Sequence, residues 1–433
     1  VEFDTRDGTV VGVEDVSFHI NPGETVCVVG ETGSGKSVSS LSMMRLVEFG
    51  GGRVAGGQLI FDRAEGGKIN VADADQSLMC SIRGNEIGMI FQEPMTALNP
   101  VLTVGRQLTE GLRVHKGINK AEAKQSAIEL LEKVRIPEPE KRLDQYPHEL
   151  SGGMRQRVVI AMALACEPRL LIADEPTTAL DVTIQAEILA LIERLKQETG
   201  TAVLFITHDM AVVAQVADRV VVMFRGNKVE EGTVEQIFKN PQHAYTQSLL
   251  AAVPKLGEMK GTIYPERIRL KADEKKAAEP IIGSNDVLLK VRNLVTRFPM
   301  KSGLMRRVTA NVHAVEDVSF TMMKGRTLSL VGESGCGKST VGRSLLRLIE
   351  PLYGSVKING VDVLAMQKQE LHEARRHMQM VFQDPFASLD PHMRLIDQVA
   401  EPMQNYKTLN EDEIKQRVEM LFDRVKLPRS FLR

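Results

Sequence analysis

The stretch "GETGSGKS", Gly30–Ser37, decides the fold, and it returns as "GESGCGKS" at Gly332–Ser339. Both fit G-x4-G-K-[ST], the pattern of a phosphate-binding loop. In such a loop, glycines let backbone N–H groups converge on phosphate oxygens, and the next helix adds positive potential at its N-terminus. The pattern predicts a first nucleotide-binding set of Gly30, Glu31, Thr32, Gly33, Ser34, Gly35, Lys36 and Ser37. The second set is Gly332, Glu333, Ser334, Gly335, Cys336, Gly337, Lys338, Ser339 and Thr340.

The segments around the first loop alternate between strand and helix patterns. "TVCVV" (Thr25–Val29) is an apolar, β-branched run, and a helix is expected from about Gly35. "LLIAD" (Leu170–Asp174) and "AVLFIT" (Ala202–Thr207) are typical of buried strands, and Glu187–Gly200 between them has helical spacing. This alternation predicts an α/β fold with a mainly parallel sheet. "RVVVMFRGNKVEEG" (Arg219–Gly232) predicts an added antiparallel hairpin that turns at Gly226 and Asn227.

Internal repeats divide the chain. "VEDVSF" at Val13–Phe18 recurs at Val315–Phe320, and the phosphate loops follow the two copies. We therefore expect a first domain over residues 1–254, with an extension from about 240, and a second over 287–433. Residues 255–286, rich in Lys, Glu, Ala and Pro, are expected to be a linker. We also expect the second copy to be incomplete and the chain to be a piece of a longer protein, cut at both ends.

Composition excludes several classes of protein. Lys+Arg number 55 and Asp+Glu 56, so a net charge of -1 gives no cationic excess for nucleic-acid binding. The four cysteines, Cys27, Cys80, Cys166 and Cys336, form no CxxC pair, which argues against a zinc or iron–sulfur site. No apolar run approaches the roughly 18 residues of a membrane span.

Two carboxylates end one of the expected strands. Asp174 is placed to hold Mg²⁺ together with the hydroxyl of Ser37, and Glu175 can polarise the water that attacks a γ-phosphate. The alternative for this pair alone is a solvated acidic turn after a strand.

"LSGGMRQR" (Leu150–Arg157) precedes an apolar helix. Ser151 is a suitable N-cap, and Gly152 and Gly153 leave the first amides uncovered, which favours an anion site at this helix start. Plain helix capping is the alternative.

In this order, the motifs resemble those of the ATP-binding cassette ATPases. The resemblance rests on the phosphate loop, Gln92 in the Q-loop, the signature "LSGG", the "LLIADE" stretch, "ALD" (Ala179–Asp181) and "ITHD" with His208. It implies a P-loop NTPase fold in two tandem copies, the second incomplete. Each copy would hold a mainly parallel sheet with helices, an antiparallel β subdomain and a helical subdomain.

The resemblance also implies roles for single residues. Glu175 and His208 would be catalytic, with His208 contacting the γ-phosphate, and Ser151, Gly152 and Gly153 would contact ATP bound to another cassette. The cofactors would be ATP and Mg²⁺, with the metal near Ser37, Gln92, Asp174, Ser339 and Gln383. Phe3 and Phe298 resemble the aromatic residue that stacks on adenine, and core packing is the alternative for both.

Three further stretches narrow the resemblance to the peptide/nickel importer branch. They are "LSGGM", "EPMTALNP" and "NPQHAYTQSLLAAVP" (Asn240–Pro254). Within the fused pair, Leu249–Gly261 and Leu288–Phe320 resemble stretches of glutathione-import ATPases, which implies uptake of glutathione or short peptides. The implied partners are two permease subunits, an extracytoplasmic solute-binding protein, and a second cassette in the same or another chain. The implied place is the cytoplasmic face of the bacterial inner membrane, with no nucleic-acid partner. The alternatives are another oligopeptide, dipeptide or peptide-antibiotic importer, or a tandem-cassette ATPase that binds nucleic acid or ribosomes.

Overall fold

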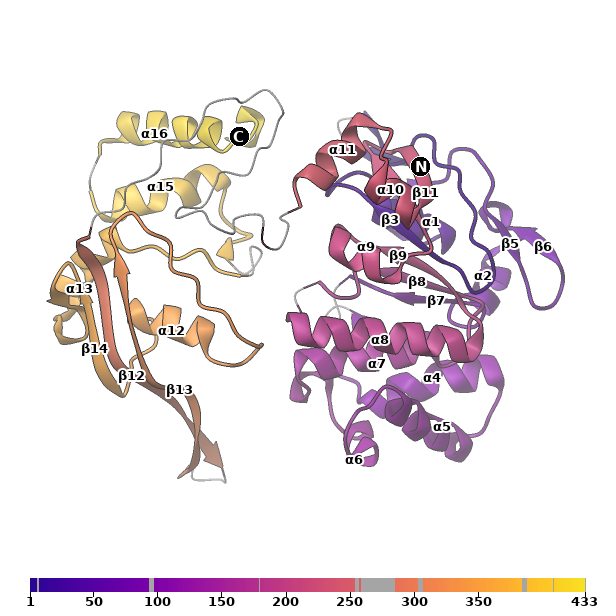
Figure 1. Ribbon diagram of the computed structural model, residues 1–433, viewed down its shortest axis with the longest axis horizontal. Coiled ribbons are helices and arrows are strands. Elements are labelled where there is room, and N and C mark those ends of the chain that lie inside the picture. The colour runs from indigo at the N-terminus through magenta and orange to yellow at the C-terminus, as the bar shows by residue number, and fades with distance from the viewer. Residues whose placement is uncertain are drawn as a thin grey trace. The chain divides into compact units, whose positions relative to one another are not determined.

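The computed structural model describes residues 1–5, 8–92, 97–178, 180–253, 257, 285–302, 307–383, 388–407 and 409–432. Contacts divide the chain into two compact units, Val1–Pro280 and Ile281–Arg433, and each is described by itself (Figure 1). The expected linker at 255–286 lies almost wholly outside the described residues. Ala179, the first residue of the "ALD" motif, also lies outside them. The division at 254 and 287 stays a prediction.

A six-stranded sheet forms the centre of the first unit, in the order β11-β10-β3-β9-β8-β7 (Figure 1). Every neighbouring pair from β7 to β10 is parallel, which confirms the predicted parallel sheet. The strands are β3 (Thr25–Val29), β7 (Ile87–Ile90), β8 (Leu170–Asp174), β9 (Ala202–Ile206), β10 (Arg219–Phe224) and β11 (Asn227–Thr233).

The predicted hairpin differs from the observed one in two respects. β10 is a member of the parallel sheet beside β3, and only β11 is antiparallel, as an edge strand. The turn lies at Arg225 and Gly226, whose φ angles are 50° and 80°, and Asn227 already begins β11. Two consecutive positive φ angles give the tight turn that matches the twist of hairpin strands.

Alternate residues of the central strands enter two separate cores. On β3, Cys27 and Val29 pack in the larger core, and Val26 and Val28 pack in the smaller one. The larger core also contains residues of α7 (Gly152–Leu164) and α8 (Val182–Thr199). The same division separates Phe205 from Leu204 on β9. Because side chains of a strand point alternately to opposite faces, this pattern means that both faces of the sheet are covered.

The helices of the first unit follow the capping signals of the sequence. Asp181 caps α8 by accepting a hydrogen bond from the N–H of Ile184 at 2.9 Å, and Gly200 ends it with φ 68°. The helices are α1 (Lys36–Met43), α2 (Gln76–Ile82), α4 (Val104–Lys116), α5 (Lys120–Lys133), α6 (Pro139–Leu143), α7 (Gly152–Leu164), α8 (Val182–Thr199), α9 (Met210–Val216), α10 (Val234–Lys239) and α11 (Ala244–Ala251). Short 3-10 turns span Val47–Gly50, Val71–Asp73 and Pro147–Glu149.

Two small antiparallel sheets complete the unit. One has the order β2-β1-β4, and the other pairs β5 with β6. Their strands are β1 (Glu2–Thr5), β2 (Gly8–Val11), β4 (Gly52–Arg53), β5 (Ile60–Asp62) and β6 (Lys68–Asn70).

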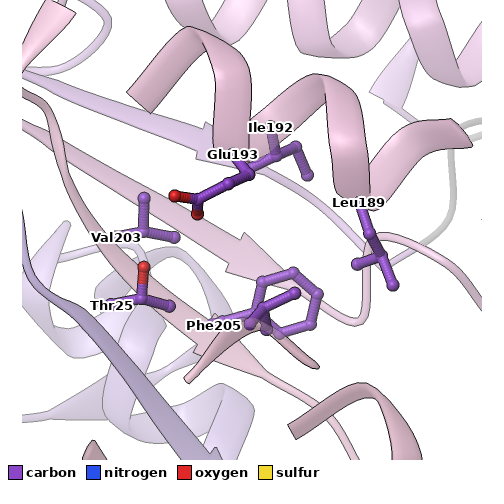
Figure 2. A pocket seen from close by; sticks show the side chains of 7 residues that line it. Thr25, Leu189, Ile192, Glu193, Val203 and Phe205 are labelled. Atoms are coloured by element: carbon purple, nitrogen blue, oxygen red, sulfur yellow. The ribbon is translucent and has the colours of Figure 1, made fainter. Parts of the chain in front are cut away.

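A small cavity lies between α8 and the sheet, lined by Thr25, Leu189, Ile192, Glu193, Val203, Phe205 and Val216 (Figure 2). Its free volume of about 10 Å³ is at the lower limit for one water molecule. Ligand pockets measure roughly 300–1,000 Å³, so this cavity is a packing defect and not a nucleotide site.

Phe205 is one of the side chains that line this cavity and is 1% exposed (Figure 2). Phe205→Ala is expected to lower the unfolding free energy of the first unit by about 3–5 kcal/mol, because it removes a buried ring and enlarges the void. Urea unfolding measures this, with Phe49→Ala as the control because Phe49 is 73% exposed. A loss no larger than that of the control would contradict the described core.

The second unit contains an antiparallel sheet in the order β13-β12-β14-β15 (Figure 1). Leu289, Val291, Leu294 and Val356 form its core with residues of α12 and α13. The strands are β12 (Val287–Ser302), β13 (Arg307–Met323), β14 (Tyr353–Ile358) and β15 (Val361–Asp362). The helices are α12 (Lys338–Leu345), α13 (Lys368–Ala374), α15 (Leu395–Asn405) and α16 (Glu411–Arg424), with 3-10 turns at Val363–Ala365, Arg375–His377 and Arg429–Leu432.

The segment that corresponds to β3 is not a strand in the second unit. Thr327–Val331 has the apolar pattern of Thr25–Val29, yet Leu330 is 44% and Val331 89% exposed. In the first unit, β3 pairs with β10 and β9 on its two sides, and its apolar side chains pack in the two cores of the sheet. The described residues of the second unit contain no strands that correspond to β10 and β9.

Across the described ranges of the chain, we find no helix with the length and apolar character needed to span a membrane.

Candidate nucleotide site

The first phosphate loop joins the end of β3 to the start of α1, as the sequence predicts. Gly30 has φ 152°, and a Cβ there would lie 2.2 Å from the carbonyl oxygen of Met223. Gly35 has φ 96°, and a Cβ there would lie 2.6 Å from the carbonyl oxygen of Gly12. Both positions therefore require glycine, because any side chain would meet backbone and strain the loop.

Lys36 lies inside the curve of this loop and is 6% exposed. Its Nζ donates to the carbonyl oxygens of Gly30 at 2.8 Å and Glu31 at 2.9 Å. Burial lowers the pKa of this ammonium, against the opposing effect of the carboxylates of Glu175 and Asp174. The loop thus holds a cation at the place where phosphate oxygens are expected.

One buried polar atom in the loop fits a nucleotide. Ser34 is 3% exposed, and its Oγ makes no hydrogen bond within the described part of the chain. A buried hydroxyl without a partner is costly, so such a group indicates a ligand or water at the site.

Ser37 and Asp174 bring the phosphate loop and the end of β8 together. The Ser37 hydroxyl donates to Oδ1 of Asp174 at 3.1 Å, and Asp174 is 4% exposed. Burial is the main cause that raises the pKa of Asp174 above its usual value, and the hydrogen bond from Ser37 opposes it. A divalent cation beside this pair would restore the charged form.

The residues at this place suit Mg²⁺ bound together with phosphate. Within the described ranges, no three His, Cys, Asp or Glu side chains gather as a ready-made metal site. Mg²⁺ usually takes only one or two protein carboxylates and completes its shell with phosphate oxygens and water. The hydroxyl of Ser37 and the carboxylate of Asp174 fit that donor set.

Glu175 is the centre of a hydrogen-bonded cluster. Its Oε1 lies 3.0 Å from Nδ1 of His208, and its Oε2 accepts from Thr178 Oγ1 at 2.9 Å and Gln92 Nε2 at 3.1 Å. The Glu175 side chain is 10% exposed, whereas that of His208 is 57% exposed. Burial alone would raise the pKa of Glu175, but the hydrogen bonds from His208, Thr178 and Gln92 outweigh it and keep the pKa below its usual value. Glu175 is therefore a carboxylate at neutral pH.

The backbone of Glu175 is also unusual. Its φ is 47°, in the left-handed region that non-glycine residues rarely adopt, and its N–H donates to the carbonyl of Ile206 at 2.9 Å. Such strain is typical of functional positions.

The signature residues begin α7. Ser151 caps the helix by accepting from the N–H of Met154 at 3.3 Å, as predicted, and both Ser151 and Gly152 are exposed. Gly153 packs near Ile184, because a Cβ there would lie 3.2 Å from that side chain. Gln156 of the same helix donates to the carbonyl of Pro176 at 2.6 Å and so ties the signature helix to the segment after Glu175.

The two candidate adenine-stacking residues lie in different surroundings. The ring of Phe3 lies against Gly52 and Gly12, where built Cβ atoms would approach it to 2.6 Å and 3.1 Å. Phe298 lies on β12 and is 39% exposed. Phe3 therefore makes packing contacts of the kind expected if it is a core residue. Stacking on adenine stays a prediction for both Phe3 and Phe298.

The second loop repeats only part of this geometry. Lys338 donates to the carbonyls of Gly332 at 2.7 Å and Glu333 at 2.6 Å, as Lys36 does in the first loop. However, Ser339, Cys336 and Gln383 are exposed in the second unit.

Two site residues were not found by sequence reasoning. Thr178 follows the carboxylate pair by a short turn and holds Glu175, and "TT" after "DEP" was the available signal. Tyr245 accepts a hydrogen bond from the N–H of Glu31 at 2.9 Å, across 214 positions of sequence, for which no local pattern exists.

Family comparisons agree with the repeats. The family described as "ABC transporter" matches residues 13–178 and 315–430, one match in each compact unit. The family described as "Oligopeptide/dipeptide transporter, C-terminal region" matches residues 229–278, which include β11, α10 and α11 in part or whole.

Individual relatives are similar over nearly the whole chain. The glutathione import ATP-binding protein GsiA of Escherichia coli (strain K12) is 52% identical over 424 residues, covering 96% of this chain and 68% of that protein. The protein of the same name from Pectobacterium atrosepticum is 50% identical over 434 residues, covering 99% of this chain and 70% of that protein. A solved dimeric ATP-binding cassette, in a post-hydrolysis state bound to ADP and Pi, is 29% identical with a TM-score of 0.48, covering 54% of this chain and 95% of that one.

Proposed function

The chain belongs to the ABC transporter family, and from this premise we propose that it hydrolyses ATP to energise import of glutathione or short peptides. The observation that carries the proposal is the cluster of Glu175, His208, Gln92 and Thr178 beside Lys36 and the Ser37–Asp174 pair. It supplies a carboxylate for water and a cation for phosphate at one edge of a parallel sheet.

In this proposal Glu175 is the base that polarises the attacking water. Its low pKa keeps it ionised, and its hydrogen bonds fix the direction of the carboxylate. His208, at 3.0 Å from Glu175 and largely exposed, is free to contact the γ-phosphate while it orients the base.

Lys36 and the loop amides bind the phosphates of ATP, and Lys36 leaves its two carbonyl partners to do so. Ser37 and Asp174 hold Mg²⁺, with Gln92 able to turn toward it from Glu175. The metal supplies positive charge against the β- and γ-phosphates. Phe3 is proposed to stack on the adenine.

The second loop is proposed as a second ATP site, with Gly332–Thr340 around the nucleotide and Ser339 and Gln383 toward Mg²⁺. Its lysine contacts, which repeat those of the first loop, support this. Phe298 would be its adenine-stacking residue. Ser151, Gly152 and Gly153 would contact ATP bound to another cassette, and the exposure of Ser151 and Gly152 at the start of α7 supports this.

Two permease subunits and an extracytoplasmic solute-binding protein are the proposed partners. The chain would act at the cytoplasmic face of the bacterial inner membrane as a peripheral subunit. The names of its relatives and the match to the oligopeptide/dipeptide C-terminal region support this. The linker at 255–286 would join the domain at 1–254 to the one at 287–433.

Reconstitution tests the transport proposal. The chain is co-expressed with candidate permease pairs, purified through a tag on one permease, and placed in proteoliposomes with the solute-binding protein. We expect glutathione to stimulate ATP hydrolysis and to be transported. Stimulation by dipeptides alone would redirect the substrate assignment, and co-purification with RNA in place of a permease would contradict the importer.

Hydrolysis is also expected to depend on protein concentration. Residues 1–433 contain "LSGG" once, at Leu150–Gly153. In the proposed pairing, a purified chain of these residues completes its first loop with the signature of a second copy. Specific ATPase activity should rise with concentration until dimers dominate. Activity unchanged over a hundredfold dilution range would count against this pairing.

A mixing experiment supplies the control for pairing. Ser151→Arg blocks the signature but keeps the base Glu175. Glu175→Gln removes the base but keeps the signature. An equal mixture of the two inactive variants should recover part of the activity, because a mixed dimer has one complete site.

A further inference from the structure

Helix α11 touches the phosphate loop through one side chain. The hydroxyl of Tyr245 accepts a hydrogen bond from the backbone N–H of Glu31 at 2.9 Å. The ring of Tyr245 packs on Phe224, the last residue of β10, with centroids 4.3 Å apart and planes tilted by 31°. Because the ring of Tyr245 packs against Phe224, the hydroxyl is held within hydrogen-bonding distance of the Glu31 N–H.

The start of α11 is itself fixed to the sheet. Glu230 on β11 accepts from the N–H of Gln242 at 2.7 Å and from that of His243 at 3.0 Å. Burial alone would raise the pKa of Glu230, but these backbone hydrogen bonds help to hold it below its usual value. The carboxylate therefore stays charged and keeps the helix N-terminus in place.

The peptide group that joins Gly30 to Glu31 is held from both sides. Its N–H donates to Tyr245, and its carbonyl accepts from Nζ of Lys36 at 2.8 Å. A peptide group is planar, so fixing its N–H and its C=O sets the direction in which the loop leaves β3. Gly30, at φ 152°, is the flexible joint beside it.

We propose that Tyr245 is a positioning residue, which keeps this first peptide of the loop in the nucleotide-binding orientation when Lys36 turns to the phosphates. The inference rests on the proposed function of the same loop. ATP binding takes the ammonium away from the carbonyl of Gly30, whereas the hydrogen bond to Tyr245 does not compete with ATP. The loop is then pre-organised, and binding costs less reordering.

This contact also joins two matched regions of the chain. Tyr245 lies within residues 229–278, the oligopeptide/dipeptide C-terminal region, while Glu31 lies in the phosphate loop of the ABC transporter match. Movement of α11 would therefore change nucleotide affinity at the first loop.

Tyr245→Phe tests the inference, because it removes the hydroxyl and keeps the ring on Phe224. The variant is made in a Lys338→Ala background, so that ATP binding reports the first loop. We expect Kd and KM for ATP to rise roughly three- to tenfold, because the released loop must be reordered on binding at a cost of up to one hydrogen bond, with kcat within about twofold. In hydrogen–deuterium exchange, the amide of Glu31 should exchange faster.

Tyr406→Phe is the matched control, because the Tyr406 ring contacts His372 and Arg376 in the second unit. It should change neither KM nor exchange at Glu31. Unchanged Kd, KM and exchange in Tyr245→Phe would overturn the proposal, and so would a fall in kcat with constant KM.

Measurements on the unsubstituted chain keep the proposal testable even if the variant is poorly folded. The amide of Glu31 should remain slow to exchange when ATP is bound, and rapid exchange under saturating ATP would also overturn it. The two hypotheses fail separately. A chain that neither binds nor hydrolyses ATP contradicts the proposed function, whereas an active chain with an unaffected Tyr245→Phe variant contradicts only this inference.

Discussion

Glu175→Gln is expected to lower kcat for ATP hydrolysis by about 100-fold or more, since a positioned general base contributes roughly 10²–10⁴-fold. The amide has nearly the shape of the carboxylate and can still accept from Thr178, so the cluster should keep its form. ATP affinity should stay within about threefold of the unsubstituted chain. Single-turnover phosphate release and equilibrium ATP binding separate the two effects.

The pH dependence of this deficit adds a check. The pKa of Glu175 lies below its usual value, so the group is a carboxylate above that range and loses its charge only in more acidic solution. The ratio of kcat in the unsubstituted chain to kcat in Glu175→Gln should thus be the same at pH 6 and pH 8. Glu235→Gln is the matched control, because Glu235 is 74% exposed and forms an ion pair with Lys239 on the surface of α10. A Glu175→Gln variant with more than a fifth of normal turnover would remove Glu175 as the base.

The second large effect, a loss of ATP affinity, is expected for Lys36→Ala. This substitution removes a buried ammonium that fills the phosphate loop, and hydrogen bonds to charged groups are worth about 1.5–3 kcal/mol. ATP affinity at the first loop should fall roughly 10- to 100-fold, and hydrolysis should be lost with it. The measurement is ATP binding in the Lys338→Ala background.

Lys239→Ala serves as the control for Lys36→Ala, since the Lys239 side chain is 75% exposed. It should leave ATP affinity unchanged. If Lys36→Ala and Lys239→Ala bind ATP equally well, the lysine inside the loop has no role in binding phosphate.

The sequence could predict those parts of the first unit whose signals are local. β3, β8 and β9 are continuous apolar runs, and α8 lies between a capping Asp181 and a terminating Gly200. The meeting of Ser37 with Asp174 also follows, because the carboxyl ends of β3 and β8, with β9 between them, lie at the same edge of one parallel sheet.

Other contacts depend on neighbours that are distant in sequence. The apolar run of β10 does not reveal that β3 is one of its partners, so the sequence predicts only the antiparallel hairpin that β10 forms with β11. Nor does "HAY" reveal that Tyr245 reaches Glu31, since the contact requires the sheet to bring α11 to the loop.

The second unit illustrates the same limit. Thr327–Val331 has a strand-like pattern, but the described residues of the second unit supply no parallel strand for it to pair with. A local sequence pattern predicts a tendency to form a strand, and the availability of neighbouring strands decides whether the strand forms.

The most direct test of the first unit as an ATPase is phosphate release from ATP by the purified chain, with Mg²⁺ and with a chelator, beside Glu175→Gln. The account predicts release that requires Mg²⁺, increases with protein concentration, and falls about 100-fold or more in the variant. Release that is absent at every concentration, or equal in the unsubstituted chain and the variant, would contradict it.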